Sequence, residues 1–320
     1  MKSFNGRIAV VTGGGSGIGR ELVRQLAGQG ANVAMGDLFA DAMAETKRLC
    51  EADDVPAGVR ITAHVVDVAD QSAMDRFAAE VARHHETDCI HALFNNAGVG
   101  GGASFVNAPR EEWERVFSIC WNGVYFGCRS FLPLLMKADE GAVVNTSSAN
   151  GFWAAFRPNV THTAYSTAKF AVKGFTESLI NDFRHNAPHL TAHVVMPGGV
   201  GTQISLNSRR VLMGGDTPFT QEELIAIRQR FAGMGIAGAV EMDEAEIKRE
   251  MARQPETKPT TPAQAATIIL DAVKAERWRI VVGEDAQRLD RRVRTHPDSA
   301  YDLDFPGYEP FVEGEEAELV

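Results

Sequence analysis

The chain has 320 residues, 44% of them hydrophobic and 23% charged, which is the composition of a globular protein with ample material for a core. Its 32 basic and 42 acidic residues give a formal net charge of −10, which argues against nucleic acid or an anionic membrane as the main partner. The four cysteines form no CxxC pair and no apolar run approaches the ~18 residues of a membrane span, so we expect a cytoplasmic protein with reduced thiols, without bound metal and without a membrane anchor.

Seven short apolar runs, rich in β-branched residues, alternate with segments of helical period. Strands this apolar, separated by helices, are typical of βαβ units and of a parallel sheet covered on both faces. The sequence therefore predicts an α/β fold, a Rossmann-like, doubly wound parallel sheet of about seven strands in a single domain. The expected strands are Ile8–Thr12, Asn32–Met35, Ile61–Val66, Ile90–Phe94, Ala142–Thr146, Thr191–Met196 and Trp278–Val282, and helices include Gly19–Gln29, Ser72–His84 and Glu111–Met136.

The first predicted strand leads into the stretch VVTGGGSGIGR, which opens a helix. Its glycines follow the pattern TGxxxGxG rather than GxGxxG, but they still allow a sharp turn and a close approach to a ligand. The N–H groups at the start of the helix can then bind a pyrophosphate. A turn that merely links strand to helix is the alternative. The expected cofactor-binding residues of this loop are Gly13, Gly15, Ser16, Gly17, Ile18 and Gly19.

Two acidic residues follow the next two strands. Asp37 ends the second strand, where a carboxylate can accept hydrogen bonds from ribose hydroxyls and repels a 2′-phosphate. No Arg or Lys follows it before Lys47, so NAD is favoured over NADP, although Asp37 could instead cap the next helix. Asp67, with Val68 after it, could hold the adenine amino group or serve as an ordinary turn residue, and both interpretations stay open.

The segment THTAYSTAKF places Tyr165 and Lys169 four residues apart, so both side chains share one face of a helix. A phenol with a pKa of about 10 is a poor base near neutrality, but an ammonium group within ~4–6 Å favours the phenolate. The spacing therefore favours a proton-transfer pair. A solvated tyrosine beside a surface lysine is the alternative.

Taken together, these motifs resemble the short-chain dehydrogenase/reductase family over about residues 5–283. The resemblance rests on several ordered motifs with approximately the family's spacing. They are TGGGSGIG (12–19), DV (67–68), NNAG (95–98), the asparagine of WNGVYFG (Asn122), VVNTSS (143–148), YSTAK (165–169) and MPGGVGT (196–202).

The resemblance implies roles for single residues. Tyr165 would be the general acid/base, Lys169 would hold the nicotinamide ribose and lower the pKa of the tyrosine, and Asn122 would complete a proton relay. Ser148, rather than its neighbour Ser147, would bind the reacting oxygen. The further cofactor contacts implied are Asp67, Val68, Asn95, Asn96, Ala97, Gly98, Tyr165, Lys169, Pro197, Gly198, Val200 and Thr202.

The resemblance also implies a homodimer or homotetramer. The subunits would meet through the helices containing Glu111–Met136 and Ala164–Asn186, and three residues of the second helix are candidates for the interface. They are Ser178, Leu179 and Phe183.

The regular alternation pauses between Met196 and Thr261. We interpret 197–261 as a helical substrate-binding insertion, long enough for a lid, within an NAD(P)-binding domain of residues 1–283. Residues 284–320 then form a C-terminal extension. The helix-start signals in this part are the capping boxes Thr220 with Glu223 and Asp243 with Glu246, and the N-cap Thr261 before Pro262.

The interval of 17 residues between Ser148 and Tyr165 is a few residues longer than is usual in the family. It adds the stretch FWAAFRPNV to the rim of the site. Apolar residues near the site indicate either a pocket for a bulky, mostly uncharged alcohol or ketone, or a core or subunit contact. They are Phe152, Trp153, Phe156, Val200, Ile204 and Leu206.

The sequence thus predicts an NAD-dependent enzyme that interconverts a small-molecule secondary alcohol and a ketone, with Tyr165 as the acid/base. One alternative is a family member that reduces 3-oxoacyl thioesters, for which Asp37 is unfavourable. Another is a dinucleotide-sensing protein without turnover, which has no need of a proton donor.

Overall fold

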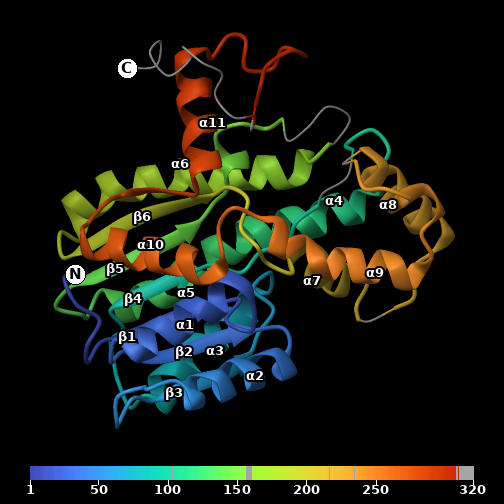
Figure 1. The fold of residues 1–320 in the computed structure, drawn as a ribbon. Helices are drawn as coiled ribbons and strands as arrows, with labels where there is room; N and C mark the ends of the chain where they lie inside the picture. Colours follow the sequence, from blue (N-terminus) through green and yellow to red (C-terminus); the bar gives the residue numbers. More distant parts are fainter. Residues whose placement is uncertain (102–103, 156–160, 216, 234, 308, 310–320) are drawn as a thin grey trace.

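The computed structural model describes residues 1–101, 104–155, 161–215, 217–233, 235–307 and 309. Its centre is a seven-stranded sheet in the order β3-β2-β1-β4-β5-β6-β7, and every adjacent pair is parallel, as predicted (Figure 1). From β1 the chain adds β2 and β3 on one side and then β4 to β7 on the other, so the strand order reverses between β1 and β4. Ligands of such sheets bind at this point, outside the carboxyl ends of the strands. The strands are β1 (Ile8–Thr12), β2 (Asn32–Asp37), β3 (Ile61–Val65), β4 (Ala92–Asn95), β5 (Gly141–Thr146), β6 (Leu190–Pro197) and β7 (Arg279–Val282).

Helices cover both faces of this sheet because its strands are apolar on both sides. On β1, Val11 belongs to one buried cluster and Val10 to the other. The first cluster includes α1 (Gly17–Gly28), α2 (Ala40–Ala52) and α10 (Pro262–Lys274), and the second α3 (Gln71–His84), α4 (Arg110–Phe117), α5 (Gly123–Leu135) and α6 (Thr163–Asn186).

The predicted helix Glu111–Met136 is not one regular helix. A π-helical turn, Ser118–Asn122, separates α4 from α5. Such turns put an extra residue into the helix and occur often at functional sites. Asn122, one of the expected site residues, is the last residue of this turn.

The segment between β6 and α10 folds into α7 (Ile204–Leu212), α8 (Gln221–Gly233) and α9 (Glu244–Arg253), drawn in orange at the right of Figure 1. Both expected capping boxes form, since Thr220 pairs with Glu223 and Asp243 with Glu246. Its small core contains Phe219, Leu224, Phe231, Ala239, Ile247 and Met251. The insertion thus carries its own apolar centre.

The chain after β7 continues as α11 (Glu284–Thr295), which packs on β7 and beside the turn after β5. Arg292 of this helix is fully buried and donates to the carbonyl oxygens of Gly307 and Glu309. The extension is therefore folded onto the sheet domain at least that far. The acidic end from 310 onwards lies outside the described residues. None of the helices in the described part of the chain has the length and apolarity needed to cross a bilayer.

Candidate active site

Tyr165 and Lys169 lie one turn apart on α6 and meet beside the carboxyl end of β5. The Lys169 Nζ atom is 5.5 Å from the centre of the Tyr165 ring and donates a hydrogen bond of 2.9 Å to the carbonyl of Thr146. Lys169 is almost entirely buried, although part of the Tyr165 ring remains exposed. The structure therefore brings together the two groups that the helical spacing predicted as neighbours.

The two adjacent serines after β5 have different partners. Ser147 is buried and donates its hydroxyl to the carbonyl of Lys169 at 2.7 Å, so it fastens α6 to the sheet. Ser148 instead forms a hydrogen bond with the Tyr165 hydroxyl, and its Oγ atom accepts a bond of 3.1 Å from the amide of Asn150. Ser148 is thus the serine that faces the phenol.

Burial controls the protonation of the pair. It raises the pKa of the Tyr165 phenol well above its ordinary value; nearby Cys120 raises it further and the bond from Ser148 lowers it. Burial also lowers the pKa of the Lys169 amine, with Cys120 opposing. In the chain by itself desolvation outweighs the lysine, contrary to the expectation that the spacing alone makes Tyr165 acidic.

Cys120 and Gly98 complete the floor of this site. The Cys120 thiol is fully buried and donates to the carbonyl of Val99 at 3.4 Å. A Cβ atom on Gly98 would lie 3.5 Å from the Lys169 Nζ atom and 3.9 Å from the Cys120 sulfur. The sequence offered no signal for the position of Cys120, because its neighbours belong to distant motifs.

Asn122 lies close by on the π-helical turn, which packs against α6. Its side-chain amide donates to the Ser118 hydroxyl at 3.0 Å. The bond to Ser118 therefore fixes the orientation of this amide.

The glycine loop after β1 is shaped by contacts with the turn after β4. Gly13 and Gly17 have positive φ angles of 70° and 53°. A Cβ atom on Gly13 would lie 2.9 Å from the Cα atom of Ala97, and one on Gly19 would lie 2.0 Å from the carbonyl oxygen of Gly13. Only glycine allows this turn and this approach, and the amides at the start of α1 then face the carboxyl edge of the sheet.

Asp37 lies beside this loop at the end of β2. Its two carboxylate oxygens accept from the amides of Gly15, at 3.0 Å, and Phe39, at 3.1 Å. Burial raises the pKa of Asp37, while these amides and that of Leu38 oppose the rise. The carboxylate is thereby fixed at the adenosine side of the loop.

Two other residues that were expected to bind the cofactor have side chains that contact other parts of the protein. The Asn95 side chain points into the core and donates to Asn145 at 2.9 Å, so only its backbone remains for a ligand. Asp67 accepts from the amide of Ala69 and forms an ion pair of 2.8 Å with Arg115. Of the two interpretations of Asp67, the turn residue is the one with observed contacts.

Helix α7 reaches across to the loops of the cofactor side. Asn207 donates to the Ser16 hydroxyl at 3.0 Å, and the Ser208 hydroxyl accepts from the amide of Gly100 at 2.7 Å. Arg210 pairs with Asp41 at 3.2 Å and stacks 3.8 Å from the centre of the Phe39 ring. These residues lie 108 to 191 positions from their hydrogen-bond partners, and no local pattern indicates the contacts.

The residues Pro197–Thr202 connect β6 to α7 along the same edge. The amide of Gly198 donates to Val282, and that of Gly201 to Thr260. The Thr202 side chain approaches the glycine loop, since a Cβ atom on Gly17 would lie 3.0 Å from its Cγ2 atom. The segment therefore lies between the sheet and the glycine loop.

The apolar residues expected near the site divide into several groups. Trp153 is buried against the C-terminal extension, with its indole N–H donating to Ala300 at 2.6 Å, and Phe152 packs in the same cluster. Leu206 packs on the core of the insertion. Val200 is half-buried, Ile204 is exposed, and Phe156 lies outside the described residues.

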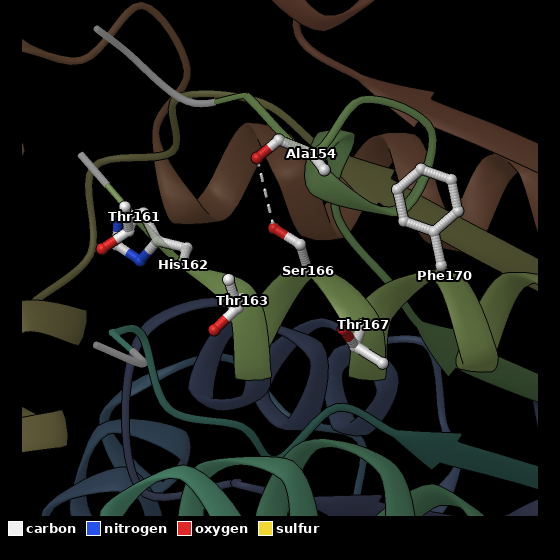
Figure 2. A pocket seen from close by; sticks show the side chains of 7 residues that line it. All are labelled: Ala154, Thr161, His162, Thr163, Ser166, Thr167 and Phe170. Atoms are coloured by element: carbon white, nitrogen blue, oxygen red, sulfur yellow. Dashed lines mark hydrogen bonds between the residues drawn. The ribbon is translucent and has the colours of Figure 1, made fainter. Parts of the chain in front are cut away.

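A hollow of about 480 Å³ lies beside the first turns of α6 (Figure 2). The Ser166 hydroxyl bonds across it to the carbonyl of Ala154 at 3.5 Å. Tyr165 and Lys169 are not among its lining residues, but the ring of His162, which lines it, lies 6.4 Å from that of Tyr165. Its lining residues are Ala154, Thr161, His162, Thr163, Ser166, Thr167 and Phe170.

Across the described ranges, no group of three or more His, Cys, Asp or Glu side chains has the arrangement of a metal site.

Comparisons with known proteins agree with this geometry. The family described as short chain dehydrogenase matches residues 7–211. The chain is 32% identical over 290 residues to the oxidoreductase SadH of Mycobacterium tuberculosis, covering 91% of each protein. It is 30% identical over 203 residues to the D-beta-hydroxybutyrate dehydrogenase of Cupriavidus necator, covering 63% of this chain and 73% of that one.

The fold has solved counterparts. A short-chain dehydrogenase/reductase from Burkholderia phymatum, in complex with NAD, superimposes with a TM-score of 0.74 at 24% identity over 98% of this chain and all of the other. A short-chain dehydrogenase from Novosphingobium aromaticivorans gives 0.68 at 25% identity, covering 100% of this chain and 94% of the other. With a family match over more than half its length and a relative aligned almost end to end, this chain belongs to the short-chain dehydrogenase/reductase family and is an oxidoreductase.

Proposed function

We propose that the protein interconverts a secondary alcohol and a ketone with NAD as the cofactor. The observation that carries the proposal is the position of Ser148, Tyr165 and Lys169 at the carboxyl edge of the sheet, on the same edge as the glycine loop. A phenol bonded to a serine hydroxyl, with an amine 5.5 Å from its ring, is arranged to move a proton to or from a substrate oxygen.

Each residue has a distinct task in this reaction. Tyr165 accepts the proton of the alcohol in oxidation and returns it to the oxygen in reduction. Ser148 donates to that oxygen while its charge develops, which is where a fixed donor helps most. Lys169, held by the carbonyl of Thr146, orients the pair, and Asn122 extends the path of the proton from the buried amine.

The residues present fit a dinucleotide. The glycine loop and the start of α1 would hold its pyrophosphate, Asp37 its adenosine ribose, Lys169 its nicotinamide ribose, and the segment 197–202 its carboxamide. When bound, the nicotinamide accepts or supplies the hydride that the side chains cannot. Asp37 favours NAD, whereas Arg210, which the insertion brings to Phe39 and Asp41, is a cation whose effect on NADP has to be measured.

The substrate is proposed to be largely apolar and uncharged. Val200 and Ile204 offer aliphatic surface next to the nicotinamide segment, and Ile204 lies beside Gly100. Because Trp153 and Leu206 pack on other clusters, the apolar wall is smaller than the sequence indicated.

A thioester of an anionic carrier is the second candidate. It would be favoured by unpaired cations near the cleft, and a hollow of about 570 Å³ on the insertion is lined by Arg209, Arg210 and Lys248. Each of these cations is paired with a carboxylate. Arg209 pairs with Glu223, Arg210 with Asp41, and Lys248 with Glu244. This local neutrality supports a free small molecule instead.

The test is NADH formation from NAD with a panel of secondary alcohols, alongside 3-hydroxyacyl thioesters and NADP. We expect turnover with NAD and an uncharged secondary alcohol. Tyr165→Phe should lower kcat by about 10²–10⁴-fold while NAD binding persists. Tyr125→Phe, a change on the surface of α5, is the matched control and should keep full activity. Near-normal turnover by Tyr165→Phe would remove the proposed acid/base, and NAD binding without any turnover would favour the sensing protein.

We also propose a cytoplasmic homodimer or homotetramer. The four cysteines carry no disulfide, and three are buried, which suits a reducing compartment. An aromatic cluster joins Trp121 of the π-helical turn, Tyr125 of α5 and Phe175 of α6. Tyr125 is exposed, which supports contact between subunits through these helices. Phe183 is buried within its own chain and so is not available for such an interface. Sedimentation velocity measures the assembly directly.

A further inference from the structure

Asp285, in the first turn of α11, contacts the segment that runs from β6 to α7. Its Oδ2 atom accepts a hydrogen bond of 2.7 Å from the amide of Gly199. The two residues lie 86 positions apart, and the family match ends at residue 211, well before α11 begins. The C-terminal extension, in red in Figure 1, therefore supplies a hydrogen-bond acceptor to the backbone of the segment between β6 and α7.

Three glycines surround this carboxylate. A Cβ atom on Gly198 would lie 2.6 Å from the Asp285 Oδ1 atom, one on Gly199 would lie 3.1 Å from Oδ2, and one on Gly283 would lie 2.5 Å from Oδ1. Gly283 also has a positive φ of 99°. A side chain at Gly198 or Gly283 would displace the carboxylate, so these glycines leave the room that Asp285 occupies.

One hydrogen bond, from Gly199, and close packing against the three glycines hold the Asp285 carboxylate in place. Its Oδ1 atom is buried, and within the described residues no hydrogen-bond partner reaches it. The bond to Gly199 is charge-assisted, which makes it stronger than a bond between neutral groups. Together with the bonds from Gly198 to Val282 and from Gly201 to Thr260, it fixes successive amides of the segment.

We propose that Asp285 is a positioning residue for the nicotinamide side of the cofactor site. Through Gly199 it sets the path of residues 197–202, whose backbone and Thr202 side chain meet the cofactor. This inference rests on the proposed function, because it takes that segment to bind the nicotinamide carboxamide. Asp285 itself touches neither cofactor nor substrate.

The experiment compares Asp285→Ala, Asp285→Asn and the control Glu284→Gln, a change at the exposed neighbour on the same helical turn. Asp285→Ala should raise the Kd and KM for NAD about tenfold and change kcat less than threefold. Asp285→Asn should stay within threefold of the parent protein, because its amide oxygen can still accept from Gly199. Glu284→Gln should leave both constants unchanged.

Hydrogen exchange of residues 198–202, followed by mass spectrometry without cofactor, gives a second measurement. It should accelerate in Asp285→Ala and not in the control. Unchanged exchange with an unchanged Kd for NAD would overturn the inference, as would equal losses in the Asn and Ala variants. A parent protein that fails to bind NAD would instead refute the proposed function, and the exchange rates would still report on the contact with Gly199.

Discussion

The two halves of the cleft are built differently. On the cofactor side, the glycine loop and the turn after β4 shape each other through backbone contacts that only glycines permit, as at Gly13 and Gly19. On the substrate side, the residues after Ser148 are held by a distant segment, because the Trp153 indole donates to the backbone carbonyl of Ala300. The first half is therefore encoded in short motifs, whereas the second depends on where the C-terminal extension folds.

The largest expected effect comes from adding one methyl group on the cofactor side. In Gly19→Ala, the new Cβ atom would lie 2.0 Å from the Gly13 carbonyl oxygen and 2.6 Å from the Asn96 side-chain nitrogen. The loop has to move, so we expect loss of NAD binding and a stability loss of about 3 kcal/mol. Calorimetric titration and thermal unfolding measure these two quantities.

Gly28→Ala, in the same helix, is the matched control. A Cβ atom there would meet nothing within 4 Å. The substitution should leave NAD binding intact and stabilise the protein by about 0.4–1 kcal/mol. Equal behaviour of the two variants would contradict the claim that close backbone contact shapes this half.

The next effect separates the two serines. Ser148→Ala removes the proposed donor to the reacting oxygen, and we expect kcat to fall by about 10²–10³-fold. It also leaves the buried amide of Asn150 without its acceptor, which should cost about 1–3 kcal/mol of stability, so kcat is the quantity that separates the two variants. Ser147→Ala removes a buried bond to α6 instead, so it should lower the unfolding free energy by about 1–3 kcal/mol while the folded enzyme keeps its kcat. Steady-state kinetics and urea unfolding together test the pair, and reversed outcomes would exchange their roles.

A smaller effect is expected on the substrate side from Trp153→Phe. The change leaves the carbonyl of Ala300 without its indole donor, which should cost about 1–3 kcal/mol and raise KM for the alcohol more than KM for NAD. Trp278→Phe changes an exposed tryptophan and should cost under about 0.5 kcal/mol. A KM for NAD that rises as much as that for the alcohol would show that the two halves are not independent.

The smallest effect is a dependence of stability on pH. It arises from two histidines near β3, the edge strand on the cofactor side of the sheet. Burial, assisted by Arg60, lowers the pKa of His85 to about 4, and burial also lowers that of His64; both bond to Thr62. In the unfolded chain histidine has a pKa of about 6.5. Folding therefore favours the neutral form of these histidines. The stability that they contribute is complete above about pH 6.5 and is lost as the pH falls towards about 4.

Thermal unfolding at about pH 7.5 and about pH 5 should differ by a few degrees for this reason. His85→Gln keeps a partner for Thr62 and cannot gain a proton, so it should show a smaller difference. If the variant loses as much stability on acidification as the parent protein, the response originates elsewhere in the molecule.

The same contrast explains which features the sequence could predict. The seven strands, the capping boxes and the neighbourhood of Tyr165 and Lys169 follow from local periodicity and spacing, and the structure has them. The π-helical turn was missed, because its extra residue shifts the apolar pattern by a single position, and α4 and α5 are too short for that shift to stand out. The dominance of burial over Lys169 was missed too, since desolvation is a property of the packed site.

Contacts between distant segments also escaped prediction. Trp153 looked like a pocket residue because of its closeness to Ser148 in the chain, yet its partner is almost 150 positions away. Arg210 and Asn207 reach the cofactor loops from the insertion in the same way. Spacing along the chain cannot reveal such pairs, because it only specifies neighbours within an element or across one turn.

The wide turn at 118–122 also limits how this chain can be shortened. The extra residue is absorbed within this turn, so deleting one residue there should restore a regular helix and leave α4 and α5 close to their present orientation. Arg115 would then keep its ion pair with Asp67, and the Trp113 indole its 3.1 Å bond to Thr163. The change would fall on the turn itself, which ends at Asn122 and packs against α6, so we expect a chain shortened here to stay folded but to lose the present position of that asparagine.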